Sequence, residues 1–360
     1  MGKRELGLIL AFVVAGLIVW QVTAPKAEGP GFSFGNWMSD VRREMRGRNA
    51  SAELKTTPAV PLEAGANELR VTIVGELTIK GEDRTDVSAE FTVTSNGFDD
   101  AEAKRLAEES KLVVSRFADS VVVTTKFPEE GSQQARLILR VPRTLRVQLD
   151  GRGTATVTDV AEVVFARASG TVKLTAVAGA VKGEFRGARL TLDGAQTLDL
   201  VSVNGEHSFS GIRGDVRLES RSGEVRLIKP GGRVIVTGRD GRIRIDGAQG
   251  DVRVEAVEGA VELNDIASGV EIDARAARVV ATWQKAAQAK IQARDGSVEL
   301  VLPKDAATYS LDARATQGEL RVPESLTKTA EGQETSAIRS GGSNASPIFV
   351  RGVGTSITIR

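Results

Sequence analysis

Gly250-Asp251-Val252-Arg253-Val254 is one unit of a pattern that repeats through the middle of this chain. Between Gly153 and Ala281 a new unit starts about every nine residues, and ten of the fifteen unit starts are glycine. The second position after the start is Val, Ile or Leu in thirteen units, and the fourth is Val, Ile, Leu or Phe in thirteen. Most residues between them are polar. Short strands with one apolar face, repeated at a fixed spacing, are therefore predicted.

Two inward side chains per strand cannot bury a core alone, but stacked units can. We therefore predict an all-β fold, a single-stranded β-helix or β-solenoid built from nine-residue strand-turn units. A coil must return to its start, so it contains a whole number of units, about 18 or 27 residues, and the sequence leaves this choice open. Glycine is expected at the bends because it adopts positive φ without penalty. An antiparallel sandwich with frequent turns is the alternative, although hairpin strands are usually longer and less evenly spaced.

The bulk composition excludes several classes of function. The 360 residues carry a net charge of only +1, so no global field attracts nucleic acid. Cysteine is absent, which excludes disulfides and thiolate chemistry. With one Tyr and three Trp, an extended surface for stacking bases or sugars is not expected.

The first 24 residues are predicted to be an N-terminal transmembrane anchor. Leu6–Ala24 carries no charge and, as a helix of about 28 Å, nearly matches a bilayer core. A cleaved signal peptide is the alternative, but Pro25 would follow the cut and disfavours processing. Lys3 and Arg4 favour a cytoplasmic N-terminus, although later arginines compete with them. The rest of the chain is thus expected outside the cytoplasm.

Three further regions are predicted. Residues 25–61 form a juxtamembrane linker, which is either a short amphipathic surface helix or disordered. Residues 62–150 form a β-rich lead-in and cap with one helix over Asp99–Lys111, started by Asp99 or Asp100. Residues 151–360 form the solenoid with C-terminal closing strands. Within this region the phase breaks after Ala281, and the polar stretch Thr327–Pro347 is expected to be a loop.

Several segments together resemble a known family. A lead-in ending Leu139-Arg140-Val141-Pro142 is followed by units such as Gly241-Arg242-Ile243-Arg244-Ile245, then by Leu300-Val301-Leu302-Pro303, and last by Gly354-Thr355-Ser356-Ile357-Thr358-Ile359. Residues 65–360 thereby resemble the bacterial putative-adhesin β-helix family of unknown function, which is related to the head domains called GIN. The resemblance implies a membrane-tethered or exported β-helix. It implies no catalytic residues.

A search for chemistry finds no catalytic, cofactor-binding or metal site. His207 is the only histidine and occupies an inward position, where a buried, hydrogen-bonded ring is expected. One histidine without cysteine makes zinc binding improbable. Calcium-binding nonapeptide solenoids need tandem glycines, whereas Asp240-Gly241 and Asp295-Gly296 are isolated pairs. The outward charges alternate in sign, as on a solvated face with weak ion pairs.

The sequence therefore predicts a non-catalytic protein of the bacterial cytoplasmic membrane. It has a single transmembrane pass and a periplasmic or extracellular C-terminal domain, and it serves as an adhesin-like binding, scaffolding or envelope-sensing module without a cofactor. Its expected partners are the membrane, through the N-terminal helix, and an envelope protein or polysaccharide, but not nucleic acid. The alternatives are a carbohydrate-active β-helix enzyme, which would need a row of paired carboxylates, and a cytoplasmic scaffold that polymerises through uncapped solenoid ends.

Overall fold

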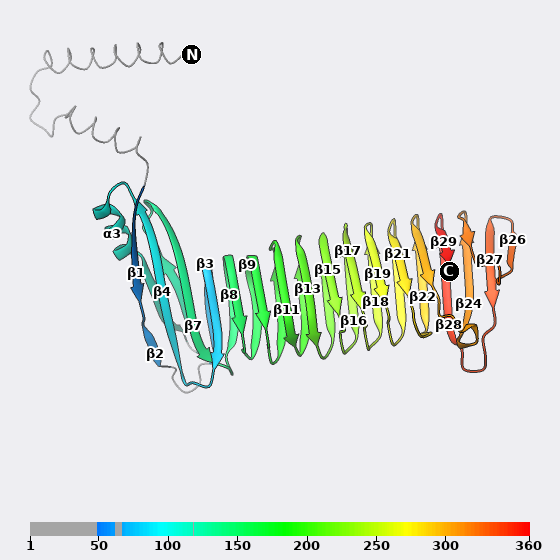
Figure 1. The fold of residues 1–360 in the computed structure, drawn as a ribbon, viewed down its shortest axis with the longest axis horizontal. Helices are drawn as coiled ribbons and strands as arrows, with labels where there is room; N and C mark the ends of the chain where they lie inside the picture. The colour runs from blue at the N-terminus through cyan, green and yellow to red at the C-terminus, as the bar shows by residue number, and fades with distance from the viewer. Residues whose placement is uncertain (1–48, 62–66, 118) are drawn as a thin grey trace, which may run out of the picture.

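The molecule is an elongated rod of stacked strands with a broader, helix-bearing N-terminal end (Figure 1). The computed structural model describes residues 49–61, 67–117 and 119–360. The predicted anchor Leu6–Ala24 and most of the predicted linker lie outside these residues and stay predictions. Among the described residues, none forms a helix that is long and apolar enough to cross a membrane.

The rod is a solenoid in which strands pair in parallel with the equivalent strand of the next coil. Val234 pairs with Val252 and Val252 with Val270, so one coil takes 18 residues, or two nine-residue units. This resolves the choice between 18 and 27. One stack of strands contains β10 (Ala180–Phe185), β12 (Thr197–Ser202), β14 (Val216–Ser220), β16 (Val234–Arg239), β18 (Val252–Val257), β20 (Val270–Arg275) and β22 (Ala289–Arg294). The opposite stack contains β11 (Arg189–Ala195), β13 (Glu206–Ile212), β15 (Gly223–Ile228), β17 (Gly241–Asp246), β19 (Ala260–Asn264), β21 (Arg278–Thr282) and β23 (Ser297–Val301).

The predicted inward positions form the core between the two stacks. Val216, Leu218, Val252 and Val254 are each at most 1% exposed, which confirms the predicted register. Gly183 is the inward position that is only half-buried. There the pairing of β10 with β9 (Glu162–Thr175) shifts, and the bulge turns Phe185 inward instead, with its ring 5.3 Å from that of Phe165.

Glycine is required at the corners of the coils for two different reasons. Gly223 adopts φ +97°, as expected for a bend, and a Cβ there would lie 2.1 Å from the carbonyl oxygen of Gly205 in the previous coil. Gly250 has an ordinary φ, but a Cβ there would lie 2.4 Å from the carbonyl oxygen of Gly232. Positive φ therefore explains only part of the pattern. Close backbone stacking between coils explains the rest.

The N-terminal end is a mixed sheet that continues into the solenoid. Its strands are β1 (Ala50–Thr56), β2 (Ala59–Pro61), β3 (Glu68–Glu82), β4 (Asp86–Gly97), β5 (Lys111–Phe117), β6 (Ser120–Lys126) and β7 (Ser132–Pro142). β3 pairs in parallel with β8 (Arg146–Thr158), and β8 pairs with β9, so the sheet and the solenoid share one ladder. Helix α3 (Asp100–Glu109) packs beside β4 and β1, and the Asp99 side chain caps it by accepting a hydrogen bond from the Glu102 N–H. The predicted helix and its cap are confirmed.

The C-terminal end does not follow the order of the sequence. After β23 the chain forms a 3₁₀ turn (Ala306–Thr308), β24 (Tyr309–Thr316) and β25 (Leu320–Arg321). The hairpin β26 (Lys328–Glu331) and β27 (Glu334–Arg339) follows, then β28 (Ser346–Val353) and β29 (Ser356–Ile359). β28 pairs with both β22 and β24, and β29 pairs with both β23 and β25. The coil formed by the last residues of the chain therefore lies between two coils formed by earlier residues (Figure 1).

This arrangement corrects one expectation about the polar stretch. Thr327–Pro347 contains the β26–β27 hairpin, which covers the final coil, and is not one continuous loop. The sequence pattern predicted a loop because the residues of β26 are exposed on both faces and show no alternation of apolar and polar side chains. The predicted closing strands β28 and β29 do form, but one coil inside the tip of the rod.

Candidate binding cavity

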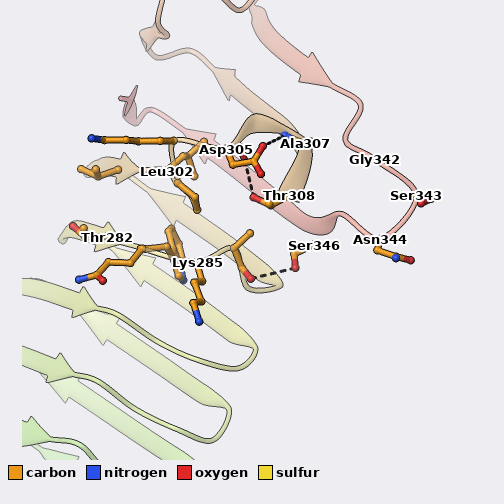
Figure 2. Close-up of a pocket in the computed structure, with 16 residues that line it drawn as sticks. Thr282, Lys285, Leu302, Asp305, Ala307, Thr308, Gly342, Ser343, Asn344 and Ser346 are labelled. Atoms are coloured by element: carbon orange, nitrogen blue, oxygen red, sulfur yellow. Dashed lines mark hydrogen bonds between the residues drawn. The ribbon is translucent and has the colours of Figure 1, made fainter.

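A cavity of about 1080 Å³ opens at the corner of the rod where the order of the coils changes (Figure 2). Three loops meet there, and each leads into a neighbouring strand of one stack: the loop before β22, the loop before β28 and the loop before β24. The cavity is lined by Thr282, Trp283, Gln284, Lys285, Ala286, Val301, Leu302, Pro303, Lys304, Asp305, Ala307, Thr308, Gly342, Ser343, Asn344 and Ser346.

The first loop stands out because its coil is one residue longer than the 18-residue coils that precede it. Glu271 and Lys290, which are neighbours across β20 and β22, lie 19 residues apart, whereas paired residues from β12 to β20 lie 18 apart. The Ser346 hydroxyl donates to the Ala286 carbonyl oxygen at 3.4 Å and ties this loop to the start of β28. The nine-residue repeat is interrupted after Ala281, and the residues at this interruption form one wall of the cavity.

The lining of the cavity is largely apolar. Trp283 and Leu302 are 3% and 9% exposed and belong to the continuous hydrophobic core of the rod. The indole Nε1 of Trp283 is buried and has no hydrogen-bond partner among the described residues. Buried donors usually have a partner, so an unpaired one calls for an explanation. This donor is not accessible from the cavity, so Trp283 contributes apolar ring surface to the wall.

Two lysines carry the positive charge of the cavity. Lys285 and Lys304 come from different loops, both are exposed, and neither forms an ion pair with a described residue. The carboxylate of Asp305 is already engaged, because its Oδ1 accepts from the Ala307 N–H at 3.1 Å and caps the 3₁₀ turn. Two ammonium groups at an apolar cavity favour a ligand that bears negative charge.

A second cavity of about 730 Å³ continues along the same corner. It shares Ala286 and Ser346 with the first and reaches back past Lys290 and Arg253 to Arg233. Its charges are mostly compensated: Arg253 lies 2.9 Å from Glu255, and Lys290 lies 3.2 Å from Glu271. The two cavities form one groove with an apolar end and a polar, charge-balanced extension.

His207 lies in the core and does not line this groove. Its ring is 3% exposed, packs 5.6 Å from the Phe185 ring, and has Nε2 2.8 Å from the Asn204 carbonyl oxygen. Burial lowers the pKa of His207, and the backbone hydrogen bonds only partly offset this. The ring is therefore neutral near pH 7 and fills an inward position that its neighbours fill with aliphatic side chains.

Many of the charged side chains of the solenoid form ion pairs on its surface. Arg244 lies between Asp246 and Glu262, with N–O distances of 3.0 and 3.6 Å. Within the described residues, no group of three or more His, Cys, Asp or Glu side chains is arranged to hold a metal ion. Sequence reasoning did not identify the cavity lysines as site residues, and their only signal was the interruption of the nine-residue phase.

Comparisons with known proteins are consistent with the architecture. The family model described as Toastrack DUF4097 matches residues 67–350. No curated protein matches the chain. Among solved structures, a "putative adhesin" of Parabacteroides distasonis is similar at 13% identity and TM-score 0.35, over 70% of this chain and 98% of that one.

Two further solved structures are similar at equally low identity. A "putative lipid binding protein" of the same organism matches at 11% identity and TM-score 0.35, over 71% of this chain and 98% of that one. A "putative cell adhesion protein" of Clostridium sporogenes matches at 11% identity and TM-score 0.22, over 86% and 99%. At these values, none of the three carries an inference about a ligand.

Proposed function

The chain belongs to the Toastrack DUF4097 family, and we propose that it is a membrane-anchored, extracytoplasmic binding module that takes its ligand at the corner cavity. The family match confirms the resemblance predicted from the sequence. Binding, rather than catalysis, is the proposed activity. The solenoid serves as a rigid support that holds the cavity away from the membrane.

The observation that carries this proposal is the cavity itself, whose largely apolar lining includes two exposed lysines from different loops. Other cations of the solenoid, such as Lys173, also form no ion pair with a described residue, but they do not border this cavity. An apolar cavity with a few convergent polar groups is the usual form of a small-ligand site, and about 300–1,000 Å³ is its usual size. The cavity, at about 1080 Å³, is slightly larger than the upper end of this range.

The proposed location depends on the sequence of the N-terminus. Leu6–Ala24 is uncharged and long enough to span, Pro25 disfavours cleavage, and Lys3 and Arg4 favour retention of the N-terminus in the cytoplasm. A reporter that is active only outside the cytoplasm, fused after Arg360, is expected to be active. An inactive reporter would reverse the topology and support the cytoplasmic scaffold instead.

Binding is tested by photo-crosslinking in intact cells. A photoreactive amino acid at Ala307, an exposed cavity residue, is expected to capture an envelope molecule. The matched control is the same amino acid at Ala178, an exposed residue at the opposite end of the solenoid, where no adduct is expected. Equal labelling at the two positions, or no adduct at Ala307, would refute the cavity as the binding site.

A further inference from the structure

We infer that the corner cavity binds the acyl chain of a single-chain anionic lipid, with Lys285 and Lys304 holding its head group. This inference rests on the proposed function and specifies its ligand. It starts from the side chains that line the cavity, which separate into an apolar wall and two cations.

The apolar wall favours a hydrocarbon chain. Trp283, Val301, Leu302 and Pro303 contribute ring and aliphatic surface, and each methylene that leaves water on binding adds to the affinity. The side chains of Trp283 and Leu302 are fixed because they belong to the core of the rod. The wall is thus preorganised, and little ordering cost falls on the protein.

The head group is assigned from charge. Lys285 and Lys304 come from the loop before β22 and the loop before β24, so the field of both favours an anionic head group at the mouth of the cavity. Charge-assisted hydrogen bonds to an ammonium group are about twice as strong as neutral ones. Asp305 borders the same cavity and keeps its negative charge while its carboxylate caps the 3₁₀ turn, so two lysines and one carboxylate leave the lining with a net positive charge.

Trp283 contributes its ring, and not its polar atom, to the binding surface. Its indole Nε1–H is buried, so a ligand in the cavity does not reach this donor, and the acyl chain would contact the ring instead.

The test uses the full chain in nanodiscs of phosphatidylcholine, with photoreactive palmitic acid as the probe. Adducts mapped by mass spectrometry are expected on the peptides that contain Trp283 and Ala307. The double variant Lys285→Glu/Lys304→Glu is expected to reduce this labelling about tenfold. Ala307→Trp, which fills the cavity, is expected to abolish it.

The controls separate charge from folding. Lys173→Glu/Lys328→Glu makes the same change in net charge at exposed lysines outside the cavity and is expected to leave the labelling unchanged. Thermal midpoints of all variants report folding. Equal labelling by photoreactive hexadecanol would refute the anionic head group. Labelling by photoreactive phosphatidylglycerol but not by palmitate would refute the single chain.

Failure of this inference can be distinguished from failure of the proposed function. If palmitate does not label the cavity but the crosslinker at Ala307 captures another envelope molecule, the proposed binding function is supported and the lipid is refuted as its ligand. If neither probe reacts at the cavity, both are wrong.

Discussion

Arg351 on β28 binds the carboxylate of Asp312 on β24 through two parallel hydrogen bonds, Nη1–Oδ1 at 2.8 Å and Nη2–Oδ2 at 2.9 Å. The two residues are 39 positions apart in the sequence, yet they lie on adjacent strands because the last coil is inserted between earlier ones. Arg314 adds a third contact at 3.0 Å. The hydrogen bonds from the two guanidinium groups hold the pKa of Asp312 down to about 2.

Asp312→Asn is expected to destabilise the C-terminal coils by roughly 1 to 2 kcal/mol at pH 7, after allowance for solvent screening. Because the folded pKa of Asp312 lies below its ordinary value of 3.8, this stabilisation is present above pH 3.8 and is lost as the pH falls towards 2. Urea unfolding of the two proteins should therefore differ at pH 7 and converge near pH 2. Asp273→Asn, at an exposed carboxylate on β20, is the matched control and should have little effect.

Gly223→Ala is expected to lower the thermal midpoint strongly. A Cβ at this position would lie 2.1 Å from the Gly205 carbonyl oxygen, and φ is +97°. Gly332 in the β26–β27 turn also has positive φ, +58°, but nothing lies within 4 Å of a Cβ there. Gly332→Ala therefore costs only the backbone strain of about 1 kcal/mol. Equal midpoints for the two variants would refute the close stacking of the corners.

Val252→Asp is expected to destabilise the solenoid by several kcal/mol, because it buries an unpaired carboxylate among aliphatic side chains. Arg253→Asp removes exposed ion pairs with Glu255 and Glu271 and should cost about 1 kcal/mol or less. Chemical denaturation measures both. Similar losses for the two neighbours would contradict the inward and outward alternation.

His207 is expected to make stability depend on pH in the acidic range. Its folded pKa is lowered by burial, so the unfolded chain binds the proton more readily. Stability is therefore complete above the ordinary pKa of 6.5 and falls as the pH drops below it, with a slope of at most about 1.4 kcal/mol per pH unit. His207→Phe keeps a ring beside Phe185 and Phe209 and should remove this component. An unchanged slope between pH 6.5 and 5 would contradict the burial of a neutral ring.

The repeat in the sequence was sufficient to predict the strands, their faces and the helix started by Asp99. It could not decide the length of the coil, because two or three nine-residue units carry the same alternation. It could not reveal that β28 enters between β22 and β24, since that order depends on pairing between strands more than fifty residues apart. The segment after Ala281 was recognised only as a break in the repeat, because the cavity exists only where three loops from residues 282–346 meet.

The most direct test of the account is the mass of the full-length protein released from native membranes and measured under non-denaturing conditions. We expect the wild-type protein to carry an additional noncovalent mass, and the Ala307→Trp variant, whose cavity is filled, to lack it. The Ala178→Trp variant is the matched control and should retain the ligand. A wild-type protein without added mass, or an added mass retained in Ala307→Trp, would contradict the claim that the corner cavity is the binding site.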